Sequence, residues 1–129
     1  MRNLAALTVA YLLSILFMTF HLTDDIVHHG GMGPIEFAAS VVIPVVWLYG
    51  TLVLAGRPAG YIINGLVSLL ALLIPVTHII GAGGVINGGM AKSGDPFFFI
   101  WVLMALSITA IFSLILSLLG LWKLRRSAQ

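Results

Sequence analysis

Four long apolar stretches constrain this chain more than any other feature of its sequence. They run approximately over residues 4–21, 35–55, 61–80 and 97–122. A helix needs about 20 apolar residues to cross the hydrocarbon of a bilayer, and each stretch supplies roughly that number. Because lipid offers no hydrogen-bond partner to an open strand edge, the stretches predict helices rather than strands.

The composition agrees with an integral membrane protein. Of the 129 residues, 60% are hydrophobic and 8% are charged, whereas a soluble domain carries about 25% charged residues. Little chain remains outside the spans, so we expect one all-α domain over residues 1–129. That domain is a membrane four-helix bundle of two helical hairpins in the same orientation. The first apolar run is longer than the usual signal-peptide run of about 7–15 residues, so we expect it to be retained.

The distribution of charge predicts the orientation in the membrane. Five of the six Lys and Arg residues flank the same ends of the spans: Arg2, Arg57, Lys123, Arg125 and Arg126. The positive-inside rule then places both termini in the cytoplasm of a multi-pass protein of the cytoplasmic (inner) membrane. The basic pI is explained by this rule, and no nucleic-acid partner is expected. The run Phe97-Phe98-Phe99-Ile100-Trp101 is assigned to the outer aromatic belt.

The two outer connections resemble each other. Both contain Gly-Gly-Met followed by proline, at residues 30–34 and 88–96, and each is preceded by a histidine, His21 or His78. This pattern favours a tandem repeat of hairpins, related by an axis along the membrane normal. Such an axis would bring His21 and His78 together. The alternative is that Gly-Gly pairs are ordinary in a chain with 14 glycines.

Every histidine and every carboxylate lies at the ends of the spans that are predicted to face outward. These eight residues are His21, Asp24, Asp25, His28, His29, Glu36, His78 and Asp95. Ionisable groups are costly near hydrocarbon and commonly have a function there. The chain has no cysteine, so thiolate ligands are excluded. No nucleophile arrangement is visible and no catalytic residues are expected, which favours a binding protein over an enzyme.

The segment from His21 to His29 is the strongest local pattern. If the first span continues as a helix until Gly30, its three histidines and two aspartates share one helical face. Imidazole and carboxylate ligands at this spacing suit Zn, Cu or Fe. We therefore predict a transition-metal site formed by His21, Asp24, Asp25, His28 and His78. His29, Glu36 and Asp95 are expected in supporting positions, and Glu36 also suits the N-terminus of a helix.

His78 follows Pro75 by three residues, and a bend at the proline could aim its ring inward. The simpler interpretation of His78 is a boundary histidine bonded to a nearby carbonyl. For the first segment, the simpler interpretation is a solvated extension with Asp–His ion pairs, each worth only about 0.3–0.5 kcal/mol. A cluster that senses pH or handles protons is a further alternative.

Three functions remain open from the sequence. The first is metal handling or redox support at an outward-facing site. The second is a structural or assembly subunit without chemistry of its own, bound to itself as a homo-oligomer or to other membrane subunits. The third is a protein with a b-type haem ligated by His21 and His78. Polar residues within the spans, such as Asn64, Ser113 and Ser117, are expected to serve helix packing.

Overall fold

A computed structural model describes residues 2–28, 33–81, 86 and 96–127. Its regular secondary structure is helical, and the described residues include no strand. The four helices are α1 (Arg2–His28), α2 (Pro34–Leu52), α3 (Pro58–Ile80) and α4 (Pro96–Ser127). Each is long and apolar enough to cross a membrane, which indicates a multi-pass membrane protein.

The helices begin and end close to the predicted positions, with two informative differences. α1 does not stop at His21 but continues to His28, as the stripe of histidine and aspartate requires. α2 ends at Leu52 rather than Ala55, and the chain then turns through Gly56, whose φ of 74° is one that glycine readily adopts. Proline opens α2, α3 and α4 at a first-turn position, where its missing N–H costs no hydrogen bond.

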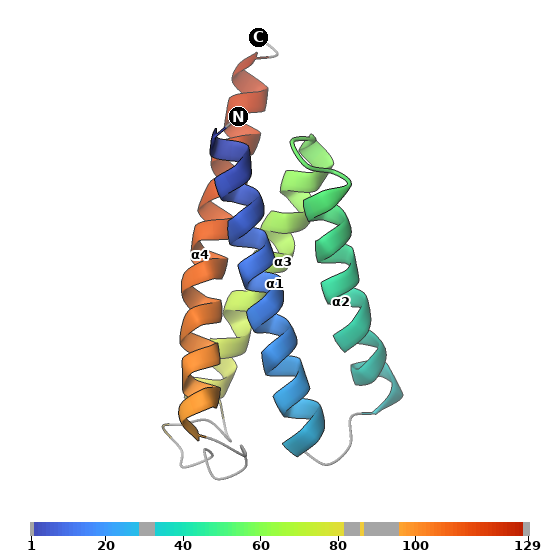
Figure 1. Cartoon of the computed structure of the whole chain (residues 1–129), viewed down its shortest axis with the longest axis vertical. Helices are drawn as coiled ribbons and strands as arrows, with labels where there is room; N and C mark the ends of the chain where they lie inside the picture. Colours follow the sequence, from blue (N-terminus) through green and yellow to red (C-terminus); the bar gives the residue numbers. More distant parts are fainter. Residues whose placement is uncertain (1, 29–32, 82–85, 87–95, 128–129) are drawn as a thin grey trace.

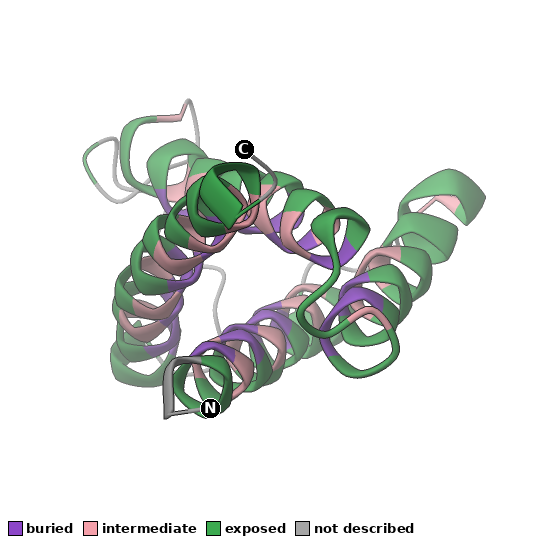
Figure 2. Cartoon of the chain, turned by 90° about the horizontal axis from the view of Figure 1, so that it is seen from above, coloured by how far each residue is buried: buried purple, intermediate pink, exposed green. Residues whose placement is uncertain are grey.

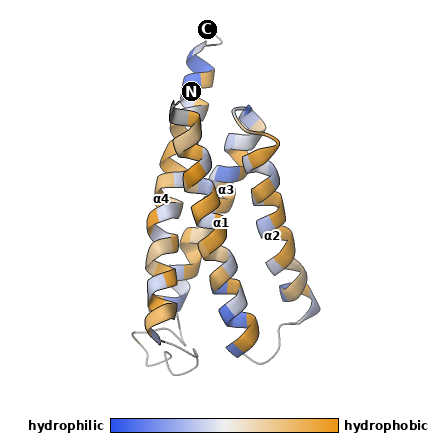
Figure 3. Ribbon diagram, in the orientation of Figure 1, coloured by the Kyte–Doolittle hydropathy of each residue, from blue (hydrophilic) through white to orange (hydrophobic). Residues whose placement is uncertain are grey.

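The chain forms two hairpins, and both termini lie at one end of the molecule (Figure 1). We call this the terminal end; it also carries the turn between α2 and α3. The opposite end, where α1 stops and α4 starts, is called the histidine end. Figure 3 shows mostly apolar residues along the lengths of the four helices, with hydrophilic residues more frequent toward these two ends.

The two hairpins do not pack alike. α4 packs along both α1 and α3, whereas α2 contacts these helices less extensively. The buried residues of α2 all lie in its second half, at Trp47, Gly50 and Thr51. Its first half lies away from the other three helices (Figures 1 and 2). The packing of the two hairpins therefore does not follow the predicted tandem repeat. His21 and His78 nevertheless approach each other.

Hydroxyl groups join α1 to α4 inside the bundle. The Tyr11 and Ser117 hydroxyls lie 2.6 Å apart, and the Ser14 and Ser113 hydroxyls lie 3.0 Å apart. Ser117 donates its proton to the Ser113 carbonyl, so Tyr11 is the donor to Ser117. These contacts confirm that Ser113 and Ser117 serve helix packing. Small residues let two helices approach, and each such bond contributes about 0.6 kcal/mol in lipid.

Asn64 performs the same role between α2 and α3. Its side-chain oxygen accepts a hydrogen bond from the Thr51 hydroxyl at 2.9 Å, and its amide donates to the Gly60 carbonyl. An apolar layer follows toward the histidine end. Its buried members are Met18, Trp47, Val67, Ala71, Leu106 and Ala110.

The α1–α4 contact predicts that two serines of α4 differ in how much stability is lost when each is replaced by leucine. Ser113→Leu places a larger side chain where Ser14 already fills the space, so it should destabilise the protein by about 1–3 kcal/mol. Ser107→Leu should cost much less, because Ser107 lines an open groove between α3 and α4. Thermal unfolding of the purified protein, followed by circular dichroism, measures both. Equal losses would contradict this account of the contact.

Candidate metal centre

His21 occupies a position that belongs to the packing stripe of α1. The buried residues of this helix recur at alternating steps of four and three, through Leu7, Tyr11, Ser14, Met18 and His21. Residues at this spacing share the face that meets the neighbouring helices. A histidine at the next position of the stripe is therefore carried into the bundle rather than toward lipid or water. Its side chain is only 2% exposed.

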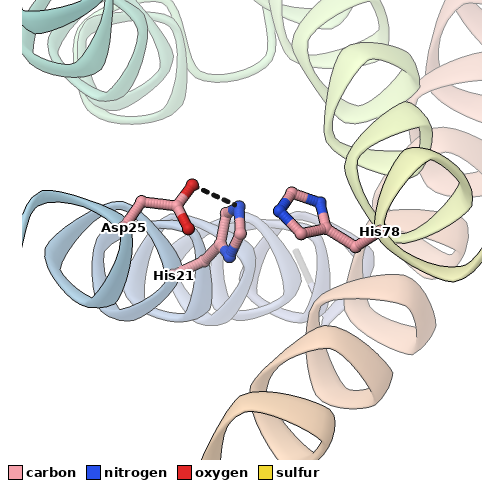
Figure 4. A group of neighbouring side chains, drawn as sticks. All are labelled: His21, Asp25 and His78. Atoms are coloured by element: carbon pink, nitrogen blue, oxygen red, sulfur yellow. Dashed lines mark ion pairs between the residues drawn. The ribbon is translucent and has the colours of Figure 1, made fainter. Parts of the chain in front are cut away.

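Two groups face the His21 ring from different helices. The Oδ2 atom of Asp25, one turn along α1, lies 3.3 Å from His21 Nε2. The His78 ring of α3 stands edge-on to the His21 ring, with 4.8 Å between ring centroids. Figure 4 shows the two imidazoles pointing toward each other, with the Asp25 carboxylate beside them. Two imidazoles and one carboxylate thus meet between α1 and α3.

The ring of His78 is held by a backbone hydrogen bond. Its Nδ1 lies 2.9 Å from the Ile74 carbonyl oxygen, which can only accept. Nδ1 therefore carries the proton, and in the neutral ring Nε2 carries a lone pair. Histidine ligands of metals are commonly oriented in this way by a backbone carbonyl. The bond expected for a simple boundary histidine is thus also the bond that prepares His78 as a ligand.

Phe99 forms the apolar wall of this group. Its ring centroid lies 6.1 Å from that of His21 and 5.5 Å from that of His78. The prediction that Phe99 belongs to an outer aromatic belt is wrong, because the residue is buried. Its neighbours Phe97, Phe98 and Trp101 are exposed as expected. A run of aromatic residues does not reveal which member turns inward; the three-residue step from Phe99 to the buried Val102 does.

The three side chains can converge on one ion. One ligand atom from each of His21, Asp25 and His78 lies within 4.8 Å of the other two. Ligands of a tetrahedral zinc ion, bonded at 2.0–2.1 Å, lie about 3.4 Å apart. The separation of 3.3 Å between His21 Nε2 and Asp25 Oδ2 already has this value. For all three atoms to reach this spacing, the His78 atom, which lies within 4.8 Å of the other two, would move toward them.

The remaining predicted site residues lie elsewhere or outside the described chain. Asp24 is buried and pairs with His28, whose Nδ1 lies 3.0 Å from Asp24 Oδ1. Glu36 is exposed and accepts a hydrogen bond from the Gly33 N–H at 2.9 Å, so it caps α2 at the helix N-terminus. His29 and Asp95 lie outside the described residues. The structure therefore gathers His21, Asp25 and His78 and leaves Asp24 and His28 as a separate pair.

The geometry suits an ion better than a haem. A haem with two axial histidines needs space for a porphyrin between the imidazole rings. Here the rings are in edge-to-face contact, and the Asp25 carboxylate approaches the ring nitrogen of His21 that would have to meet the iron.

Comparison of the chain with protein-family models, with curated proteins and with solved structures finds no match. The assignment of function therefore rests on the chemistry of the group itself.

The juxtaposition of α1 and α3 can be tested directly, because the chain has no native cysteine. The pair His21→Cys and His78→Cys should be joined by a short bifunctional thiol reagent within one chain. The matched pair His21→Cys and Ile79→Cys should not, because Ile79 is the next residue of α3 and is exposed. Mass spectrometry distinguishes linked from singly labelled chains. Equal linking of both pairs would contradict the arrangement in Figure 4.

Proposed function

We propose that this protein binds one divalent transition-metal ion through His21, Asp25 and His78, for metal handling or redox support. The observation that carries the proposal is the convergence of three ligand atoms from two helices within 4.8 Å. Helix packing alone does not call for two imidazoles and a carboxylate at one point. An ionisable group in a membrane protein commonly marks a functional site, and here three such groups share it.

The ligand set indicates which ions fit. Two histidines and one carboxylate hold zinc in several enzymes, and the same set holds Fe(II) in oxygenases. The set rejects Ca²⁺ and Mg²⁺, which prefer ligand shells made of oxygen. Three protein ligands also leave coordination positions for water or an outside ligand. A bound ion with open positions can be exchanged or can contact an outside redox partner. Either property agrees with metal handling or redox support.

The proposed orientation places this group on the extracytoplasmic side. Among the described residues, the cations Arg57, Lys123, Arg125 and Arg126 all belong to the terminal end. The positive-inside rule assigns that end to the cytoplasm. The Arg126 guanidinium lies 3.9 Å from the centre of the Trp122 ring, and both residues suit the inner interface. The histidine end then faces outward in the cytoplasmic membrane.

A second candidate is a structural or assembly subunit. Residues 34–39 of α2 are all exposed, so this part of the helix is open to lipid or to another membrane protein. This face favours association with a second copy or with other membrane subunits. A constant membrane partner that co-purifies with metal-free protein would support this candidate over the first.

Removing any of the three ligands should abolish tight binding. We expect His21→Ala, Asp25→Asn and His78→Ala each to weaken Zn²⁺ binding by more than the roughly 10- to 100-fold that loss of an outer partner costs. Glu36→Gln is the matched control, since Glu36 lies outside the group and glutamine can keep its capping bond. Isothermal titration of the detergent-purified protein without a histidine tag measures the affinities.

Two outcomes would contradict the proposed metal site. One is the absence of Zn²⁺, Cu²⁺ and Fe²⁺ binding by the folded protein. The other is a haem absorption band in the purified protein that disappears in His21→Ala or His78→Ala. Circular dichroism of each variant distinguishes loss of a ligand from loss of the fold.

The orientation predicts the accessibility of single cysteines in intact cells. Glu36→Cys at the histidine end should react with a membrane-impermeant thiol reagent added from outside. Ser127→Cys at the terminal end should react only after the membrane is permeabilised. Both residues are exposed in the structure, so a difference in labelling reports the side of the membrane. Labelling of Ser127→Cys from outside would reverse the assignment.

A further inference from the structure

Asp24 and His28 form a second pair of metal-ligand type that the three-residue group does not use. Asp24 Oδ1 lies 3.0 Å from His28 Nδ1, one helical turn further along α1. The same Nδ1 lies 3.2 Å from the Asp24 carbonyl oxygen, which can only accept, so Nδ1 carries the proton and Nε2 is the His28 nitrogen that can bind an ion. The Asp24 side chain is more than nine-tenths buried, at 8% exposed. Among the described residues, its second oxygen, Oδ2, is buried and has no hydrogen-bond partner. Burying a carboxylate oxygen without a hydrogen-bond partner costs free energy. Such an oxygen is suited to bind a cation.

Exposure falls steadily along this face of α1. The His28 side chain is 34% exposed, that of Asp25 is 19% exposed, and His21 is 2% exposed. At 1.5 Å rise per residue, His28 lies about 10 Å further along the helix axis than His21. Asp24 and Asp25 stand between these two levels. Carboxylates and imidazoles therefore connect the surface of the histidine end with the buried ring of His21.

We propose that Asp24 and His28 form an outer loading site, which takes a divalent transition metal from solution and passes it to His21, Asp25 and His78. This inference rests on the proposed metal site and adds the route by which the ion reaches it. Two ligands bind an ion less tightly than three, so the ion moves inward from the pair to the group. Asp24 and Asp25 lie three and four residues after His21, so both carboxylates lie on the side of α1 that carries His21.

The ligand chemistry explains why a pair at this place is useful. Divalent ions in water carry a hydration shell that they must shed before entering a buried group. The exposed imidazole of His28 can replace one water while the ion still faces solution, and the Asp24 carboxylate can replace a second. A carboxylate held away from water also attracts cations strongly, and sites with such a field raise association rates by about 10- to 1,000-fold.

The test separates the rate of loading from the affinity of the group. Co²⁺ alone serves as the probe, because its visible spectrum changes on binding whereas Zn²⁺ is silent. The full chain in detergent is mixed rapidly with Co²⁺ to obtain the loading rate, and is titrated at equilibrium to obtain the affinity. In the double variant Asp24→Asn, His28→Gln, loading should slow by about tenfold or more. The equilibrium affinity of the inner group should remain close to that of the wild type.

Glu36→Gln is the matched control, because it removes one carboxylate at the same end without touching the pair. It should load at the wild-type rate. The single variant His28→Gln provides a milder test, since His28 is exposed at the last residue of α1 and its loss leaves the bundle interior intact. It should also slow loading.

Two results would overturn the loading site while leaving the proposed function standing. One is an unchanged loading rate in the double variant. The other is a parallel loss of affinity as large as that of His78→Ala, which would make Asp24 and His28 members of the inner group. Failure of the wild-type protein to bind Co²⁺ would instead remove the proposed function, and the loading site with it.

Discussion

A helix in lipid can keep a polar side chain only where another helix covers it, and this constraint orders the whole structure. The cost of an unsatisfied polar group in hydrocarbon drives the hydroxyls of Tyr11 and Ser14 against α4. The same face of α1 continues toward the histidine end, where the stripe supplies His21 instead of a hydroxyl. The packing of the bundle and the position of the candidate ligand are therefore one property of α1.

The candidate group requires a ligand from a second helix, and α3 supplies His78. Local features of α3 fix the position of this residue. Pro75 is buried one turn before His78, and the Ile74 carbonyl holds the imidazole by a hydrogen bond. Phe99 of α4 closes the group on an apolar side. Three helices thus fix the group, while α2 contributes no residue to it. This division agrees with the looser packing of the first half of α2.

The sequence predicted the helices well because span length and hydropathy are properties of single segments. The metal hypothesis supposed that the first helix continues beyond His21, and the matched positions of two hairpins suggested that His21 and His78 meet; the structure has both features. The sequence did not separate Asp24 from Asp25 as partners. Both lie on the polar face, and each forms a pair with a histidine four residues away in α1. The spacing left open which pair meets His78, and the contact between α1 and α3 decides it. The inward turn of Phe99 likewise depends on the rotation of α4, which local composition does not determine.

The arrangement of the interior bears on what kind of metal handling the proposed site would support. The group lies beyond the apolar layer that contains Met18, Ala71 and Leu106, and the hydroxyls of Tyr11 and Ser117 lie on the other side of that layer. This layer offers a dehydrated divalent ion no imidazole or carboxylate among the described residues, and moving an unpaired charge across it is costly. A site at one end of such a layer would receive and release its ion on the same side. These features support a protein that holds, presents or exchanges a metal at the membrane surface over one that transports it across.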